Sequence, residues 1–96
     1  MVLIRDVFQA KYGKGGDLVA LFKEFRAEWA QEYAGRVLTD VSGPFFTVVV
    51  ETEIESLADW EQRTAEIFGA PEFGDWFARM MPLVESGRRE FYNIEA

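Results

Sequence analysis

The alternation of apolar and polar positions changes period several times along the chain, and each change predicts a new element. Residues 2–11 are rich in Val, Ile, Leu and Phe and run into a glycine-rich stretch, which predicts a strand and a turn. After Asp17, a residue suited to an N-cap, apolar residues recur every three or four positions until Gly35, which predicts an amphipathic helix. Its apolar positions are Leu18, Leu21, Phe22, Phe25, Trp29 and Tyr33.

Two β-rich runs follow the first predicted helix. They cover residues 36–41 and 45–54 and are joined by Ser42, Gly43 and Pro44, a short connection of turn-forming residues. This pattern predicts an antiparallel hairpin.

The last third of the chain predicts a helix in two pieces and a final strand. Ser56 and Asp59 resemble a capping box that opens a helix, which Gly69 interrupts. Pro71 suits the first turn of a second helical piece, and Pro82 and Gly87 end that piece before a strand over residues 88–94. The predicted order of elements is therefore β-α-β-β-α-β.

Two β-α-β halves of this kind predict a ferredoxin-like α+β fold. Its four-stranded antiparallel sheet carries the helices on one face, and a chain this short is expected to form a single domain over residues 1–96. The other sheet face would be bare, although Phe45, Val49 and either Phe91 or Tyr92 are expected to add apolar surface there. We therefore expect a homodimer in which two sheets pack face to face.

Composition then excludes much of the chemistry that small domains use. The chain contains no cysteine and no histidine, so disulfides, thiolate nucleophiles and imidazole ligands are absent. We expect no metal and no cofactor, and haem handling ranks last among the functions considered.

Charge and hydropathy argue against two classes of partner. The ten basic and seventeen acidic residues give a net charge of −7, and the basic residues are scattered, so no nucleic-acid partner is expected. The longest apolar runs fall far short of the roughly 20 residues that span a bilayer, so no membrane segment is expected and a cytoplasmic location is the default.

Four segments of the chain resemble the NIPSNAP-like branch of the dimeric α/β-barrel superfamily. They are residues 11–14 (KYGK), 43–53 (GPFFTVVVETE), 56–61 (SLADWE) and 81–92 (MPLVESGRREFY). The resemblance implies a ferredoxin-like fold that forms a dimeric α/β barrel. It also implies a range of activities, since that superfamily includes cofactor-independent monooxygenases, isomerases and haem-handling enzymes beside many members without known function.

Asp6 is the candidate residue whose chemistry conflicts most with its surroundings. It shares a strand face with Ile4 and Phe8, where a lone carboxylate costs several kcal/mol unless it is paired. We expect an arginine partner, from which Asp6 either fixes a ligand or locks the sheet. The candidate ligand pocket comprises Asp6, Phe8, Thr47, Glu51, Trp60, Phe77 and Arg79.

The remaining candidates each have an ordinary structural alternative. Glu51 with Arg79 or Arg89 would orient a polar ligand, but such charges commonly form ion pairs at a surface. Trp60, Trp76 and Phe77 would line a pocket, but aromatic residues at helical spacing commonly pack a core. No catalytic residue is assigned.

The sequence is compatible with three functions. The first is a small homodimeric protein that binds a small, partly apolar organic molecule. The second is a cofactor-independent monooxygenase or isomerase in which Asp6 or Glu51 moves a proton. The third is a structural or protein-interaction module without a ligand, which a filled interior would favour.

Overall fold

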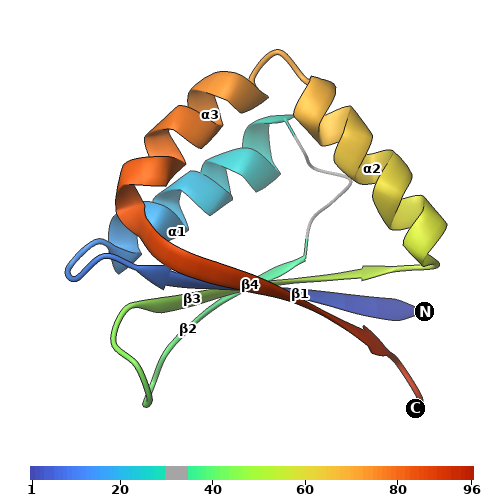
Figure 1. The fold of residues 1–96 in the computed structure, drawn as a ribbon, viewed down its shortest axis with the longest axis horizontal. Coiled ribbons are helices and arrows are strands. Elements are labelled where there is room, and N and C mark those ends of the chain that lie inside the picture. The colour runs from blue at the N-terminus through green and yellow to red at the C-terminus, as the bar shows by residue number, and fades with distance from the viewer. Residues whose placement is uncertain (30–34) are drawn as a thin grey trace.

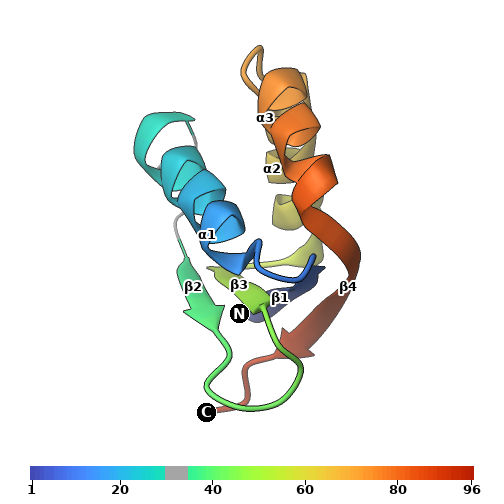
Figure 2. The same cartoon turned by 90° about the vertical axis from the view of Figure 1, so that its left-hand side faces the viewer.

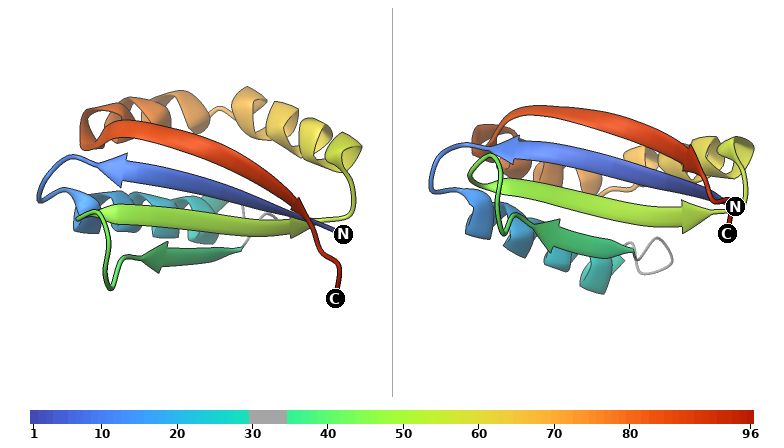
Figure 3. Two further views of the ribbon diagram at one scale, coloured as in Figure 1. Left: turned by 60° about the horizontal axis from the view of Figure 1, so that its bottom comes forward. Right: turned by 90° about the horizontal axis from the view of Figure 1, so that it is seen from below.

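The computed structural model describes residues 1–29 and 35–96, with only the backbone of Trp29 described. Four strands form one antiparallel sheet in the order β2-β3-β1-β4, which is the ferredoxin-like order (Figure 3). The strands are β1 (Val2–Ala10), β2 (Arg36–Thr39), β3 (Thr47–Ile54) and β4 (Val84–Asn93). The predicted fold class is therefore confirmed.

The helices all lie on one face of this sheet and leave the other face open (Figures 1 and 2). They are α1 (Gly15–Glu24), which continues as a π-helical segment η1 (Phe25–Trp29), α2 (Leu57–Gly69), α3 (Phe73–Met80) and the short 3-10 helix η3 (Met81–Leu83). None of the helices in the described part of the chain is long and apolar enough to cross a membrane.

Two predicted helix starts are wrong by a few residues. Helix α1 begins at Gly15 rather than after Asp17, with Lys14 at the N-cap, so Asp17 lies in the first turn, where its charge favours the helix dipole. Pro71 lies in the turn before α3 rather than in its first turn. The Ser56 cap is confirmed, because its hydroxyl accepts a hydrogen bond from the Asp59 amide at 3.1 Å. Tyr33, the last predicted apolar position of the first helix, lies outside the described residues.

Strand β4 begins at Val84, four residues before the predicted start at Arg88. Gly87 was expected to help end the preceding helix, but it lies inside the strand opposite Phe8. A Cβ atom at this position would lie 3.3 Å from the Val7 carbonyl oxygen and 3.4 Å from the Phe8 ring, so a larger residue would need a small shift of the neighbouring backbone.

The hairpin strands are shorter than predicted because the connection between them is wide. Gly43 and Phe46 both have positive φ angles, of 95° and 59°, which turn the chain out of the ladder. The Asp40 carboxylate closes this loop by accepting a hydrogen bond from the Thr47 amide at 3.0 Å. The antiparallel pairing itself is confirmed.

The fully packed core occupies one end of the space between helices and sheet. Trp76 of α3 connects the helices there, since its indole Nε1 donates a hydrogen bond to the Leu21 carbonyl at 2.9 Å. The buried members of this core cluster are Ala10, Leu18, Leu21, Phe22, Val48 and Trp76. Helix α2 contributes no buried residue, so the space between the helices and the sheet is less tightly packed at its other end.

Candidate ligand-binding cavity

A cavity of about 330 Å³ lies between the helix layer and the sheet. One row of directly opposed residues crosses all four strands and contributes to its floor: Val37, Val50, Asp6 and Arg89. Side chains of a strand alternate between faces, so the register of β1 with its two neighbours places these four side chains together. Ile4, Thr52 and Ile54 add to the cavity lining from the same face.

Helix α2 forms one wall of the cavity. Its residues Trp60, Thr64, Ile67 and Phe68 share one helical stripe and all line the cavity, although none of them is buried. In Figure 1 the helix starts beside the sheet and rises away from it, which is consistent with this exposure. The apolar stripe of α2 therefore faces open space rather than a packed core.

The opposite wall comes from the end of α1, from η1 and from α3. Its aromatic rings contact one another, with ring centroids 5.5 Å apart for Phe22 and Trp76 and 5.4 Å apart for Phe25 and Trp76. These contacts pack the wall against the core. The cavity-lining residues of this wall include Phe22, Phe25, Phe73, Trp76, Phe77 and Met80.

Asp6 and Arg89 form the polar centre of the cavity. The Arg89 Nε donates to Asp6 Oδ1 at 2.6 Å and the Arg89 Nη2 donates to Oδ2 at 3.4 Å, a two-point contact between side chains on neighbouring strands. The Arg89 guanidinium also lies 5.0 Å from the centroid of the Trp60 ring. This geometry fixes the guanidinium plane, and it supplies the arginine partner expected for Asp6.

Two further arginines line the cavity, one on α2 and one on η1. Arg63 pairs through Nε with Asp59 Oδ2 at 3.1 Å, one turn back along α2. Arg26 lies in η1 and makes no ion pair with any residue that the structure describes. A π-helical segment bonds residue i to i+5 and so changes the phase of the helix face. Arg26 lies four residues after Phe22, which also lines the cavity, so Arg26 borders the apolar stripe of its helix.

The structure divides the predicted site residues among three places. Asp6, Phe8, Trp60 and Phe77 line the cavity. Thr47 and Glu51 do not, because Val50 pairs with Asp6 and its neighbour Glu51 points to the opposite face of the sheet. The guanidinium of Arg79 lies outside the cavity, where Nη1 donates to Glu24 Oε1 at 3.1 Å and joins α3 to α1.

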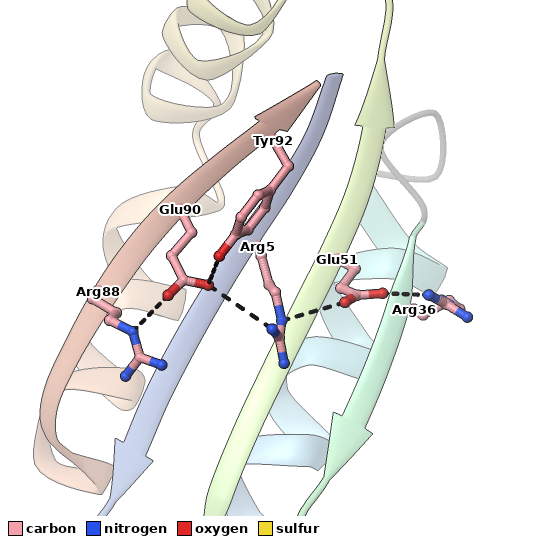
Figure 4. Close-up of polar contacts among 6 residues, drawn as sticks. All are labelled: Arg5, Arg36, Glu51, Arg88, Glu90 and Tyr92. Atoms are coloured by element: carbon pink, nitrogen blue, oxygen red, sulfur yellow. Dashed lines mark hydrogen bonds and ion pairs between the residues drawn. The ribbon is translucent and has the colours of Figure 1, made fainter. Parts of the chain in front are cut away.

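The open face of the sheet carries a row of alternating charges (Figure 4). Arg36, Glu51, Arg5 and Glu90 stand directly opposite one another on β2, β3, β1 and β4. Arg5 Nε lies 3.4 Å from Glu51 Oε2, and Arg36 pairs with the other oxygen of the same carboxylate. Glu51 is only 8% exposed even though no helix covers it, so the two arginines shield it from solvent.

Glu90 ends the charge row on β4. The Arg88 Nε donates to Glu90 Oε2 at 2.9 Å and the Tyr92 hydroxyl donates to Oε1 at 3.1 Å. The hydrogen bond from Arg88, and after it the one from Tyr92, lowers the pKa of the Glu90 carboxyl below its ordinary value of 4.5. Both hydrogen bonds favour the ionised form of Glu90.

Residues 1–29 and 35–96 contain no cluster of three or more acidic residues that is placed to hold a metal ion. The described part of the cavity lining therefore offers a guest molecule apolar and aromatic surface, one carboxylate and three guanidinium groups. Such a lining can hold an apolar body and orient a polar group.

No protein-family model and no curated protein matches the sequence. Solved structures do match its fold. An uncharacterised NIPSNAP domain protein from Burkholderia xenovorans superposes with a TM-score of 0.87 at 16% identity, over 100% of this chain and 96% of that chain. A NIPSNAP family protein from Agrobacterium tumefaciens gives a TM-score of 0.86 at 18% identity, over 96% and 90% of the two chains.

A second group of similar structures is described by an activity. A proposed antibiotic biosynthesis monooxygenase from Nitrosomonas europaea superposes with a TM-score of 0.75 at 12% identity, over 100% of both chains. The neighbours belong to the dimeric α/β-barrel superfamily of ferredoxin-like proteins. This chain has their fold, so the resemblance noted in the sequence is confirmed at the level of the fold.

Proposed function

We propose that the protein binds a small, partly apolar organic molecule in the cavity between α2, α3 and the sheet. The apolar stripe of α2 carries this proposal, because Trp60, Ile67 and Phe68 line the cavity without being buried. An amphipathic helix normally gains stability by burying such a stripe, at about 25 cal/mol for each Å² of apolar surface. A guest molecule would complete that burial.

The size and lining of the cavity support a ligand over a purely structural module. Its volume of about 330 Å³ falls within the range of small-molecule sites, which starts near 300 Å³. A module without a ligand would be expected to fill this space with side chains, as the core around Leu18 and Val48 does at the other end.

We further propose that the protein acts as a homodimer in which a second copy covers the open sheet face. Val7 and Val49 stand opposite each other at the middle of this face, where they are only 8% and 7% exposed. Accessible apolar surface comes from Leu38, beside Val49, and from the half-exposed Tyr92 near the end of β4. A stable interface buries about 800 Å² on each partner, which a whole sheet face can supply. The alternating charge row through Glu51 would then be desolvated as a set of already formed pairs.

The binding proposal can be tested by filling the cavity. Thr64 lines the cavity from α2, so Thr64→Trp should block it, whereas Gln62→Trp places the same ring on an exposed part of the same helix. Titration with N-phenyl-1-naphthylamine, a neutral fluorescent aromatic amine, should show binding to wild type and to Gln62→Trp. Thr64→Trp should bind at least about tenfold more weakly, a difference of about 1.4 kcal/mol. Equal binding by all three proteins would contradict the proposal.

A cofactor-independent monooxygenase or isomerase is a second candidate, favoured by the Asp6 carboxylate inside an aromatic cavity. A carboxylate there could accept a proton from an acidic C–H or O–H group of a bound substrate. The fold shared with the proposed monooxygenase from Nitrosomonas europaea supports the same candidate. Oxygen uptake with 1,5-dihydroxynaphthalene that is lost in Asp6→Asn would favour the enzyme, and the absence of uptake would leave binding alone.

A further inference from the structure

The cavity differs in charge from the protein that surrounds it. The chain as a whole has a net charge of −7. Among the residues that the structure describes, the charged ones that line the cavity are Arg26, Arg63, Arg89 and Asp6. Arg89 pairs with Asp6 and Arg63 with Asp59, so three positive charges less these two negative charges leave a net charge of +1, which is the charge of Arg26. A lining of this sign inside an acidic protein favours a guest of negative charge.

The three arginines come from three different elements. Arg26 is in η1, Arg63 in α2 and Arg89 in β4, so they lie on separate walls of the cavity. The three arginines are therefore brought together by the tertiary fold and not by the periodicity of one helix. Arg26 in particular makes no ion pair with the described residues, so its charge is not compensated by them.

Arg89 retains hydrogen-bonding capacity after its pairing with Asp6. A guanidinium has five N–H donors, and Asp6 engages only Nε and Nη2. The Trp60 ring and the Asp6 carboxylate fix the orientation of the group, so little side-chain entropy would be lost when Nη1 binds a ligand. Arginine held in this way is well suited to bind an oxyanion.

We propose that the ligand is an organic anion, in which an apolar body contacts the aromatic walls and a carboxylate or similar oxyanion contacts the arginines. The inference rests on the proposed function, because it names the chemical class of the molecule that fills the same cavity. The apolar body accounts for the exposed stripe of α2, and the oxyanion accounts for the excess of arginine.

Two fluorescent probes that differ in one group test the charge preference. 8-Anilino-1-naphthalenesulfonate carries a sulfonate, and N-phenyl-1-naphthylamine has the same aromatic rings without it. Wild type should bind the sulfonate about tenfold more tightly, which corresponds to one well-formed charged contact. Higher salt should weaken binding of the sulfonate and leave the neutral probe nearly unaffected.

Two matched variants test whether the preference for the sulfonate comes from an arginine that lines the cavity. Arg26→Gln should weaken sulfonate binding about threefold, the range expected for an exposed charge, and should weaken binding of the neutral probe clearly less. Lys23→Gln removes the same charge from an exposed position on α1 that does not line the cavity, and it should change neither affinity. Melting temperatures of both variants check that they fold.

The outcomes separate this inference from the proposed function. If the neutral probe binds at least as well as the sulfonate, or if Arg26→Gln and Lys23→Gln behave alike, the preference for anions is wrong and cavity binding stands. If neither probe binds wild type, both proposals are overturned.

Discussion

Asp6 and Arg89 are directly opposed on β1 and β4, and their side chains form an ion pair on the sheet face that the helices cover. The pair joins a central strand to an edge strand and lies in the floor of the cavity. Its position allows it both to stabilise the sheet and to contact a guest molecule. The two roles predict different effects of the same substitution.

Asp6→Asn should lower stability modestly and strengthen binding of an anion. The Arg89 side chain is 42% exposed, so loss of the ion pair should cost at most about 1 kcal/mol, or about 6 °C in melting temperature. Asp6 is the only carboxylate among the described lining residues, so its removal should raise affinity for the sulfonate probe about threefold. Asp17→Asn makes the same charge change at the exposed start of α1 and is the control. Loss of binding in folded Asp6→Asn would mean that Asp6 itself holds the ligand.

The alternation of apolar and polar residues was enough to predict the order of elements and the ferredoxin-like fold. Apolar stripes at helical spacing and a hairpin connection leave few ways to arrange a chain of this length. The predicted ends of elements were less accurate, because they depend on tertiary contacts. Gly87 is an example, since only its position opposite Phe8 shows that it belongs to a strand.

The candidate site was predicted only in part because strand register is not visible in a single sequence. Asp6 and Glu51 were placed in one pocket, but β1 pairs Asp6 with Val50, and this register sends Glu51 to the other face. Arg26 was missed because its charge suggests a solvated position, although it lies four residues after Phe22 and so borders the apolar stripe of the helix. Arg79 was predicted to line the pocket, but it pairs with Glu24 on α1 and lies outside the cavity. A single sequence does not show this contact between two helices.

Trp76→Phe should destabilise the protein more than a comparable change at the surface. The substitution removes the hydrogen bond from the indole to the Leu21 carbonyl and leaves space beside Phe22. We expect a loss of about 2 kcal/mol and a fall of roughly 10 °C in melting temperature. Phe68→Leu, at a ring that is 61% exposed, is the comparison and should cost much less. Equal shifts would show that the core does not depend on Trp76.

The pair between Glu24 and Arg79 should make stability depend on pH in the acidic range. The hydrogen bond from Arg79 lowers the pKa of Glu24 below its ordinary value of 4.5. A carboxyl with a lowered pKa in the folded state stabilises the protein above its unfolded pKa, and this contribution is lost as pH falls through the folded pKa. NMR titration of the carboxyl carbons should show this low pKa in wild type and a value near 4.5 in Arg79→Gln. An unchanged pKa in the variant would contradict the pairing.

Tyr92→Asp should weaken the proposed dimer. Tyr92 lies on the open sheet face and is 48% exposed, so a negative charge there should disturb an interface more than the fold. Tyr12→Asp, at a ring that is 79% exposed in the turn after β1, is the matched control. Light scattering at micromolar concentration should report a dimer for wild type and Tyr12→Asp, and a monomer of 11.0 kDa for Tyr92→Asp. A wild-type monomer would overturn the dimer itself.

The most direct test of cavity binding is an NMR titration of the tryptophan indole N–H signals with N-phenyl-1-naphthylamine. Trp60 and Trp76 both line the cavity, so a bound aromatic ring should shift both indole signals through its ring current. The guanidinium signals of Arg5 on the open face should stay in place, because the sheet separates them from the cavity. We predict saturable shifts of both indoles at one probe per chain. Shifts confined to Arg5 and its neighbours, or no saturable shift at either indole, would contradict the account.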